Sequence, residues 1–302
     1  MKLSKLGKQA VATMVRWVPD KPYLKLRYRL RTGHRLDLNN PRTFNGKIQW
    51  LKLNDRNPLY TTMVDKFEAK KYVADIIGEK YIIPTYGVWN RAEDIDFSKL
   101  PDRFVLKCTH DSGGIVVCKD KNTLDRESCI KFLDGALKSN FYYISREWEY
   151  RDVKPRIIAE KYMEDNVVND LRDYKIHCFN GKPMFIQVIG NRNFRTHTGN
   201  QMFYTFKWKK ANWAFADYPP FENDIEKPQC LREMYEIAKK LSAEMAYVRI
   251  DLYEINHHVY FGEITPYPSG GFYRYKDPYT YKTDKMLGRL IDLSAVNADK
   301  IK

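Results

Sequence analysis

The stretches Val248-Arg249-Ile250-Asp251-Leu252 and Tyr260-Phe261-Gly262-Glu263-Ile264-Thr265-Pro266 each place one acid within an apolar run, and a short polar stretch joins them. Side chains alternate between the two faces of a strand, so each acid shares its face with the residue two positions away. We expect a hairpin with an odd turn over residues 255–259. That register places Asp251 directly opposite Glu263.

The same register pairs Arg249 with Thr265. Two carboxylates directly across a strand pair repel each other. A divalent cation between them would remove the repulsion, because carboxylate oxygens are the ligands that hard cations prefer. The hairpin is therefore a candidate site for a magnesium-bound nucleotide. The alternative is a half-exposed hairpin with solvated charges, and spacing alone leaves both open.

Length and composition bound the class of protein. A chain of 302 residues can bury a real core in one large or two modest domains. No window approaches the roughly 20 apolar residues that cross a bilayer, and no secretory signal is evident. The five cysteines are odd in number and form no CxxC pair. We therefore expect neither a disulfide framework nor a zinc site, and a cytoplasmic protein.

The positive charge is concentrated at the N-terminus, where residues 1–36 carry ten Lys or Arg against one acid, Asp20. Leu3, Leu6, Ala10, Met14 and Trp17 recur there at helical spacing. A basic amphipathic helix of this kind packs on the protein body through its apolar side or lies on an anionic membrane surface. Nucleic acid is the least favoured partner.

Periodicity and turn residues predict the elements. Helices are expected after residues 40–43 and over 65–77, 124–137, 231–245 and 283–293. A strand is expected over 81–84 with its exit at 86–89, and further strands are expected over 103–107, 115–118, 156–161, 173–179 and 183–189. Residues 191–199 are expected to form a polar loop. Asn180-Gly181 is a strong hairpin signal. Hairpins outnumber strand–helix alternations, which favours an α+β chain of mostly antiparallel sheets.

Several further segments could hold a ligand. Lys107 precedes a turn that ends in Ser112, Gly113 and Gly114, where backbone N–H groups can approach phosphate closely. An ordinary hairpin turn is the alternative. Lys66 follows Asp65 at an expected helix start. A helix N-terminus favours anions, so this lysine could help to bind a phosphate. The alternative is a solvated lysine with no ligand.

Other polar positions allow two interpretations, a ligand-binding site or a solvent-exposed face. The apolar strand before Glu160 turns abruptly polar and could frame an adenine, or could simply end. Asp173, Lys175 and His177 share one strand face, which is either solvated or a polar site. The DxD triplet at residues 94–96 resembles a glycosyltransferase metal motif, but its context predicts a surface loop or helix cap.

Taken in order, these features resemble the ATP-grasp superfamily and more specifically the TupA-like ATP-grasp family of polysaccharide-biosynthesis clusters. The resemblance spans roughly residues 25–290. The strings that carry it are residues 43–52 (TFNGKIQWLK), 55–60 (DRNPLY), 64–66 (VDK), 104–107 (FVLK), 173–175 (DYK), 179–183 (FNGKP), 248–253 (VRIDLY) and 260–265 (YFGEIT). It implies two mostly antiparallel α+β subdomains that grip ATP, with a short basic helical arm before them.

The resemblance also implies a role for each matched position. The implied ATP-phosphate ligands are Lys66, Lys107, Ser112, Gly113 and Gly114, and the implied adenine frame is Glu160, Lys161, Tyr162 and Met163. Asp251 and Glu263 would ligate Mg²⁺, with Thr265 where the superfamily usually has Asn. Arg249 would stabilise the tetrahedral intermediate, and Lys175 would act near the transferred phosphoryl group. The α/β domain that many related ligases carry at the N-terminus has no counterpart here, so the acceptor site is not implied.

On this basis the expected protein is an ATP- and Mg²⁺-dependent carboxylate–amine ligase that modifies a cell-surface polysaccharide or its precursor. The expected partners are a glycan or lipid-linked glycan carboxylate, with Arg192 and Arg195 as its ligands, and an amine or amino acid. We expect a cytoplasmic protein, peripheral at the inner membrane face through residues 1–36. The expected segments are an arm (1–60), a small subdomain (61–160) and a large subdomain (161–302). A glycosyltransferase, a kinase and a non-enzymatic basic adaptor are the alternatives.

Overall fold

The computed structural model describes residues 15–111, 113–168, 170–193, 196, 198–275, 280–294 and 296. The chain forms two compact units. The first runs over Met1–Tyr23, Pro58–Tyr72 and Ile82–Met163, and the second over Leu24–Asn57, Val73–Tyr81 and Glu164–Lys302. The units therefore interleave along the sequence, whereas the three expected segments are consecutive.

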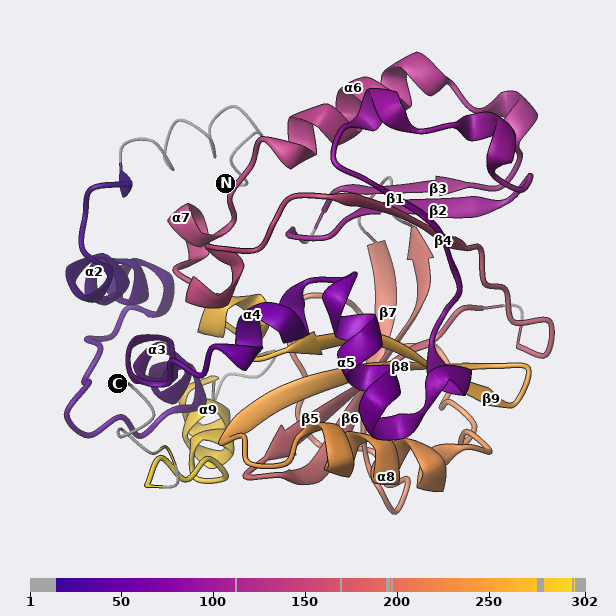
Figure 1. The fold of residues 1–302 in the computed structure, drawn as a ribbon. Helices are drawn as coiled ribbons and strands as arrows, with labels where there is room; N and C mark the ends of the chain where they lie inside the picture. Colours follow the sequence, from indigo (N-terminus) through magenta and orange to yellow (C-terminus); the bar gives the residue numbers. More distant parts are fainter. Residues whose placement is uncertain are drawn as a thin grey trace. The chain divides into compact units, whose positions relative to one another are not determined.

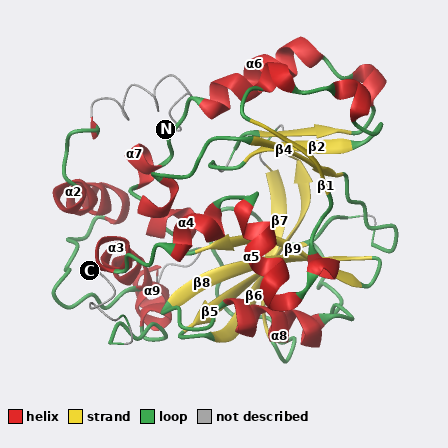
Figure 2. Cartoon of the chain, in the orientation of Figure 1, coloured by secondary structure: helices red, strands yellow, loops and turns green. Residues whose placement is uncertain are grey.

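Within the described residues, Figures 1 and 2 show helices and two sheets. The helices are α2 (Asp20–Thr32), α3 (Phe44–Asn54), α4 (Leu59–Val64), α5 (Glu68–Ile77), α6 (Arg126–Leu137), α7 (Tyr142–Ser145), α8 (Leu231–Leu241) and α9 (Thr280–Gly288). The short 3₁₀ turns are η1 (Glu79–Tyr81), η2 (Ala92–Asp94), η3 (Phe97–Lys99), η4 (Lys121–Thr123), η5 (Trp148–Tyr150) and η6 (Pro268–Gly271).

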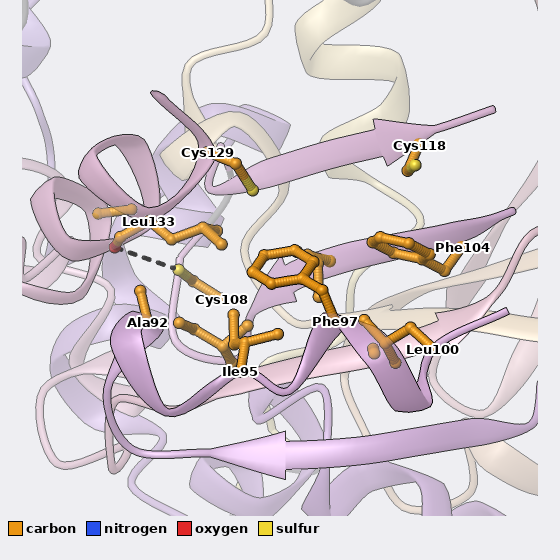
Figure 3. Packing of buried hydrophobic residues seen from close by; sticks show 13 residues of the cluster. Ala92, Ile95, Phe97, Leu100, Phe104, Cys108, Cys118, Cys129 and Leu133 are labelled. Atoms are coloured by element: carbon orange, nitrogen blue, oxygen red, sulfur yellow. Dashed lines mark hydrogen bonds between the residues drawn. The ribbon is translucent and has the colours of Figure 1, made fainter. Parts of the chain in front are cut away.

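The first unit is built on a sheet of order β1-β4-β2-β3 in which every pair is antiparallel. Its strands are β1 (Thr85–Trp89), β2 (Phe104–Cys108), β3 (Ile115–Cys118) and β4 (Ile157–Lys161). Helix α6 covers one face. Figure 3 shows Phe104 of β2 in the same apolar cluster as Cys129 and Leu133 of α6, and the thiol of Cys108 contacts the Leu133 carbonyl at 4.0 Å. The core of this unit therefore lies between the sheet and α6.

The second unit contains a sheet of order β7-β6-β5-β8-β9, again with every pair antiparallel. Its strands are β5 (Asp173–Phe179), β6 (Lys182–Asn193), β7 (Thr198–Thr205), β8 (Tyr247–Ile255) and β9 (His258–Thr265). Helix α8 packs on one face through buried Met234, Ile237 and Leu241, and its Ala238 carbonyl lies 3.9 Å from the Cys178 thiol of β5. The α+β prediction of antiparallel sheets is confirmed.

Most expected elements form, and the Asn180-Gly181 hairpin is confirmed, with φ of 50° and 72° at these two residues. Other expectations are wrong. Residues 191–199 are not all loop, because β6 continues to Asn193 and β7 begins at Thr198. Helix α9 lies over Thr280–Gly288 and ends before residue 293. The segment before Pro84 contains η1 and no strand.

The helix expected from Asp65 begins instead at Glu68. Asp65 is extended, with φ −72° and ψ 111°, and its side chain accepts hydrogen bonds from the backbone N–H groups of Phe67 (2.9 Å) and Glu68 (3.4 Å). Asp65 therefore caps the turn that leads into α5, as short acceptor side chains do before a helix. Helix α2 was not anticipated, and Leu3 to Met14 of the expected arm lie outside the described residues.

Candidate active site

In the first unit, the carboxylate of Glu160 on β4 joins two lysines. Its Oε1 lies 2.5 Å from Lys70 Nζ, and its Oε2 lies 2.5 Å from Lys107 Nζ on β2. Glu160 is only 5% exposed. Burial alone would raise the pKa of this carboxyl, but Lys107 and Lys70 outweigh it and lower the pKa to about 2. Glu160 is therefore held as a charged group.

Lys70 was not among the expected site residues. Its ammonium group also donates to the Ile83 carbonyl and to Thr85 Oγ1, both at 2.7 Å, so each of its three N–H donors has an acceptor. Burial lowers the pKa of Lys70, and Glu160 partly offsets this. Because its donors are all used within the protein, Lys70 acts to position Glu160 and the start of β1.

Lys66 is placed by the turn between α4 and α5. Arg156 Nη2 pairs with Asp65 Oδ2 at 2.6 Å, and the Lys66 backbone N–H donates to the Thr109 carbonyl at 3.1 Å. The Lys66 ammonium group donates to the Asp111 carbonyl at the beginning of the glycine turn. Lys66 and the glycine turn are therefore brought together, as the sequence suggested for a phosphate site.

The glycine turn is partly closed on itself. The carboxylate of Asp111 accepts from the N–H groups of Gly113 (3.4 Å) and Gly114 (3.0 Å). A Cβ at Gly114 would lie 2.8 Å from the Cys108 sulfur, so the close packing here requires glycine. Ser112 lies outside the described residues. An incoming phosphate would have to compete with Asp111 for these N–H groups.

The expected adenine frame continues along β4 and beyond it. Lys161 is exposed, and its N–H donates to the Pro84 carbonyl at 3.0 Å. Tyr162 is half-buried beneath the guanidinium of Arg103, 4.4 Å from the ring centre. Met163 is also half-buried. The Glu160 side chain itself is committed to the two lysines, so only its backbone remains for a nucleobase.

In the second unit, a row of charges with alternating sign crosses β6, β5, β8 and β9. Arg192 Nη1 lies 3.3 Å from Asp173 Oδ2, which lies 2.7 Å from Lys175 Nζ. Lys175 also pairs with Asp251. This row, Arg192–Asp173–Lys175–Asp251–Arg249 and Glu263, is called the charge row below. The strand face that carries Asp173 and Lys175 is therefore a buried polar site and not a solvated face.

At the other end of the charge row, the hydroxyl of Thr265 links Arg249 to Glu263. Arg249 holds both oxygens of Asp251, at 2.6 and 2.8 Å, and donates to Thr265 Oγ1 at 3.1 Å. Thr265 in turn donates to Glu263 Oε1 at 2.7 Å. The side chain of Asp251 is 3% exposed and that of Glu263 is 35% exposed. Of these two acids, Glu263 is therefore the one that solvent reaches.

The protonation states of the charge row follow from its pairing. Burial would raise the pKa of Asp251, but Arg249 and Lys175 outweigh it and lower the pKa to about 2. Burial would lower the pKa of Lys175, yet Asp173 and Asp251 raise it. Asp251 and Lys175 are therefore held as charged groups, and the row as a whole contains three acids and three bases, so its formal charges balance.

An aromatic cluster continues the same strand face. His177 stacks on Phe185 with ring centres 4.4 Å apart, and its Nδ1 lies 2.8 Å from the Tyr247 hydroxyl. Burial and the charge of Arg249 lower the pKa of His177 to about 3. His177 is therefore neutral, and on the sheet it lies between Phe185 of β6 and Arg249 of β8.

The register of the β8–β9 hairpin pairs Asp251 with Glu263 and Arg249 with Thr265, as predicted. The expected odd turn is wrong. The turn consists of Asn256 and His257, both with positive φ (51° and 61°). A register shift then follows, and Gly262 is left between paired neighbours. The bulge at Gly262 restores the pairing that an odd turn would have given.

The TupA-like ATP-grasp family matches the chain over residues 46–292. The chain belongs to this family. The matched residues include Lys66, Lys107 and Glu160 as well as the β8–β9 hairpin, so the resemblance seen in the sequence is confirmed at the level of the family.

Solved structures of ATP-grasp proteins are also similar to the chain. A D-alanine–D-alanine ligase from Bacillus anthracis is 18% identical with a TM-score of 0.46, over 80% of this chain and 70% of that one. The same enzyme complexed with ATP is 17% identical with a TM-score of 0.38, and the chain spans 54% of its length. The D-cycloserine synthetase DcsG is 13% identical with a TM-score of 0.40, over 81% and 72%. No curated protein sequence matches the chain.

The oxygens of Asp251, Glu263 and Thr265 suit a hard cation such as Mg²⁺. Asp251 already engages both oxygens with Arg249 and Lys175, whereas Glu263 is partly open to solvent. The donor types therefore fit, with Glu263 as the most accessible ligand. No group of three or more His, Cys, Asp or Glu side chains suited to a metal occurs within the part of the chain that the structure describes.

The remaining expected positions are placed as follows. Arg192 is half-buried at the end of the charge row, and Arg195 lies outside the described residues. In the DxD triplet, Asp96 accepts from the Ser98 N–H at 3.1 Å and caps η3, which agrees with the structural interpretation. None of the described helices is long and apolar enough to cross a membrane.

Proposed function

We propose that this TupA-like ATP-grasp protein is an ATP-dependent ligase that joins a carboxylate to an amine. Two observations support the proposal: membership of the family, and a buried charge row that sets Lys175 and Arg249 beside the Asp251–Glu263 pair. Fixed cations and carboxylates of this kind stabilise charge that develops during phosphoryl and acyl transfer.

The proposed reaction has two steps. An oxygen of the substrate carboxylate attacks the γ-phosphorus of ATP, and the bond from that phosphorus to the β–γ bridging oxygen breaks to release ADP. The amine nitrogen then attacks the carbonyl carbon of the acyl phosphate. The carbon–oxygen bond to phosphate breaks, phosphate leaves, and the nitrogen loses a proton to give an amide.

The nucleotide roles are assigned to the first unit. We assign the phosphates to Lys66 and Lys107 with the turn that includes Ser112, Gly113 and Gly114. The adenine frame is assigned to the backbone of Glu160 and to Lys161, Tyr162 and Met163. Lys70 holds Glu160 in place, which leaves Lys107 beside an anchored counter-charge.

The chemical roles are assigned to the second unit. Lys175 neutralises the transferred phosphoryl group, and Arg249 neutralises the oxyanion of the tetrahedral intermediate. Asp251, Glu263 and Thr265 would hold Mg²⁺, which when bound neutralises the β- and γ-phosphate oxygens. A substrate carboxylate is assigned to Arg192 and Arg195, because guanidinium groups pair bidentately with carboxylates.

The proposed substrates are a uronic-acid or peptidyl carboxylate on a cell-surface glycan or its lipid-linked precursor, and an amine or amino acid. A lipid-linked substrate would bring the protein to the inner face of the membrane, and we assign the anionic-surface contact to the basic residues 1–36. Glycosyl transfer is the weaker candidate, because Asp96 of the DxD triplet is used as a helix cap.

Hydroxylamine trapping tests the proposal. With ATP, Mg²⁺ and the correct carboxylate, the protein should form a hydroxamate and release ADP. The variant Lys175→Met should lose both products, whereas Lys182→Met, an exposed lysine of the same sheet, should retain them. ADP release without a trapped acyl group, across a panel of uronic and amino acids, would contradict ligation.

A further inference from the structure

Helix α2 exposes two neighbouring rows of side chains. One row is basic and the next is apolar, and residues within each row follow one another at i, i+4 and i+8. The exposed basic row is Lys21, Lys25 and Arg29, and the exposed apolar row is Pro22, Leu26 and Leu30. Leu26 is 61% exposed and Leu30 is 77% exposed. Leucines that are this exposed and lie one turn apart are costly in water unless a partner covers them.

The opposite face of the helix fixes which residues face outward. Leu24 and Tyr28 are buried, and the Tyr28 hydroxyl lies 3.0 Å from Thr43 Oγ1. The Tyr28 ring also lies 6.3 Å from that of Phe272. The helix is therefore held by one face, and rotating it to bury Leu26 and Leu30 would break these contacts.

No exposed acid opposes the basic row within the described residues 15–36. The acid there, Asp20, pairs with Arg146 at 3.3 Å and accepts from the Tyr142 hydroxyl at 2.8 Å. Trp17, just before the helix in sequence, is 86% exposed. The exposed side chains of this segment therefore combine positive charge, aliphatic groups and an aromatic ring.

We infer that this face of α2 lies flat on an anionic phospholipid surface, with Leu26 and Leu30 inserted at the boundary of the acyl chains and the basic row among the headgroups. An interfacial helix needs both an apolar row and a basic row. A nucleic-acid surface would satisfy the cations but leave the two leucines without an apolar partner. The inference rests on the membrane contact proposed above and narrows it to one helix face.

Flotation of the full-length protein with phosphatidylcholine vesicles, with and without phosphatidylglycerol, tests the inference. Binding should require phosphatidylglycerol and weaken with salt. The variant Lys21→Gln/Lys25→Gln/Arg29→Gln should weaken partitioning by about a hundredfold. Leu26→Ser/Leu30→Ser should weaken it by at least about tenfold.

A control variant removes the same number of positive charges from a part of the chain outside α2. Lys119→Gln/Lys131→Gln/Lys138→Gln changes three exposed lysines and should bind vesicles like the unsubstituted protein. If the α2 variants bind normally while Lys2→Gln/Lys5→Gln/Lys8→Gln does not, the contact lies in the arm and the α2 inference is wrong. If the unsubstituted protein binds no vesicle, or α2 instead retains a nucleic acid or a protein, the membrane assignment also fails. Hydroxamate formation from a water-soluble carboxylate should persist in every α2 variant, which separates this inference from the ligase proposal.

Discussion

Asp251 faces Glu263 across β8 and β9 because Gly262 forms a bulge in β9. Beside the turn, Tyr253 pairs with Tyr260 and Leu252 with Phe261. Without the register shift that follows, Asp251 would pair with Gly262, and Glu263 would fall on the apolar face beside Ile250. One glycine therefore decides whether the two acids share a face.

Gly262→Ala is expected to disturb this register. A Cβ at Gly262 would lie 2.9 Å from the Tyr253 ring and 3.0 Å from the Asp251 carbonyl, both closer than ordinary contact. We expect a loss of about 1–3 kcal/mol in the free energy of unfolding. Displacement of Glu263 should also lower MgATP-dependent turnover by about a hundredfold. Thermal unfolding and hydroxamate assays measure the two effects.

Gly135→Ala is the matched control, because a Cβ there meets nothing within 4 Å and the residue lies within α6. Alanine is the better helix former, so this variant should gain about 0.5–1 kcal/mol. Unchanged stability and metal dependence in Gly262→Ala would show that the bulge does not position Glu263.

The β8–β9 hairpin also shows which structural features the sequence pattern could predict. Alternation of polar and apolar residues placed both acids away from the core, and it paired Asp251 with Glu263 once an odd turn over residues 255–259 was assumed. It could not distinguish an odd turn from the actual two-residue turn, Asn256 and His257, combined with a bulge. Both solutions give the same final register, and the choice depends on backbone dihedral angles that a pattern does not contain.

Lys70→Met tests whether Lys70 positions Glu160. The substitution removes three donors from Ile83, Thr85 and Glu160 and leaves Glu160 with one lysine. Breaking a buried pair on one side costs about 3–5 kcal/mol, so a large loss of stability is expected. The exposed Lys71 on the same helix gives a control in Lys71→Met.

A positioning role also predicts the kinetics. Lys70→Met should raise the KM for ATP more than it lowers kcat, and Lys70→Arg should restore part of the binding. Lys107→Met should impair both constants. Equal loss of kcat and kcat/KM in Lys70→Met, with normal stability, would instead assign Lys70 to the reacting phosphate.

Lys70 was missed in the sequence because a lysine on a helix usually reads as a solvated charge. Its burial depends on Glu160, which is distant in sequence, and on the carbonyl of Ile83. The strand β7 was missed for a similar reason. The polar loop expected over residues 191–199 includes its first two residues, Thr198 and Gly199, and no strand was expected after it. In the structure Gln201 of β7 is buried and bonded to Gln187 of β6 at 2.7 Å, so tertiary pairing overrides the local pattern.

Lys175→Met should destabilise the charge row. It leaves Asp173 with Arg192 and Asp251 with Arg249, and places two buried carboxylates on paired strands without the cation between them. We expect a loss of about 3 kcal/mol. Adding Asp173→Asn should recover part of that loss, with a coupling of about 1–3 kcal/mol in a double-mutant cycle. Activity should stay absent in the double variant, and purely additive losses would argue against the Lys175–Asp173 contact.

Asp284 predicts a pH dependence of stability. Its carboxylate accepts from the Asn45 N–H at 2.9 Å and the Tyr275 hydroxyl at 3.2 Å. Burial raises the pKa of Asp284 from 3.8 to about 6, although these hydrogen bonds lower it. The folded protein therefore binds the proton more tightly than the unfolded chain, so stability falls as pH rises from about 4 to about 6. A shift of this size corresponds to about 3 kcal/mol.

Asp284→Asn should remove that slope, whereas Asp292→Asn, an exposed acid that caps Ser294, should retain it. Chemical unfolding at a series of pH values measures the difference between each variant and the unsubstituted protein. A difference for Asp284→Asn that stays constant between pH 4 and pH 6.5 would rule out this carboxyl as the source.

Metal binding should depend on nucleotide, because the formal charges of the charge row already balance. The row contains three basic residues (Lys175, Arg192 and Arg249) and three acidic residues (Asp173, Asp251 and Glu263). Both carboxylate oxygens of Asp251 already contact its two cationic partners. A cation that approaches Glu263 therefore meets little net attraction, and the triphosphate supplies the negative charge that the row lacks.

Mn²⁺, followed by electron paramagnetic resonance, is a suitable probe in place of Mg²⁺. The protein alone should bind it weakly, and a non-hydrolysable ATP analogue should tighten binding by at least about tenfold. Glu263→Gln should abolish the tightening, while Asp224→Asn, an exposed acid paired with Lys210 at 2.8 Å, should leave it intact. Tight Mn²⁺ binding without nucleotide would contradict this prediction. It would mean that Lys175 or Arg249 dissociates from Asp251 in the absence of nucleotide, so that the carboxylate is available to the metal.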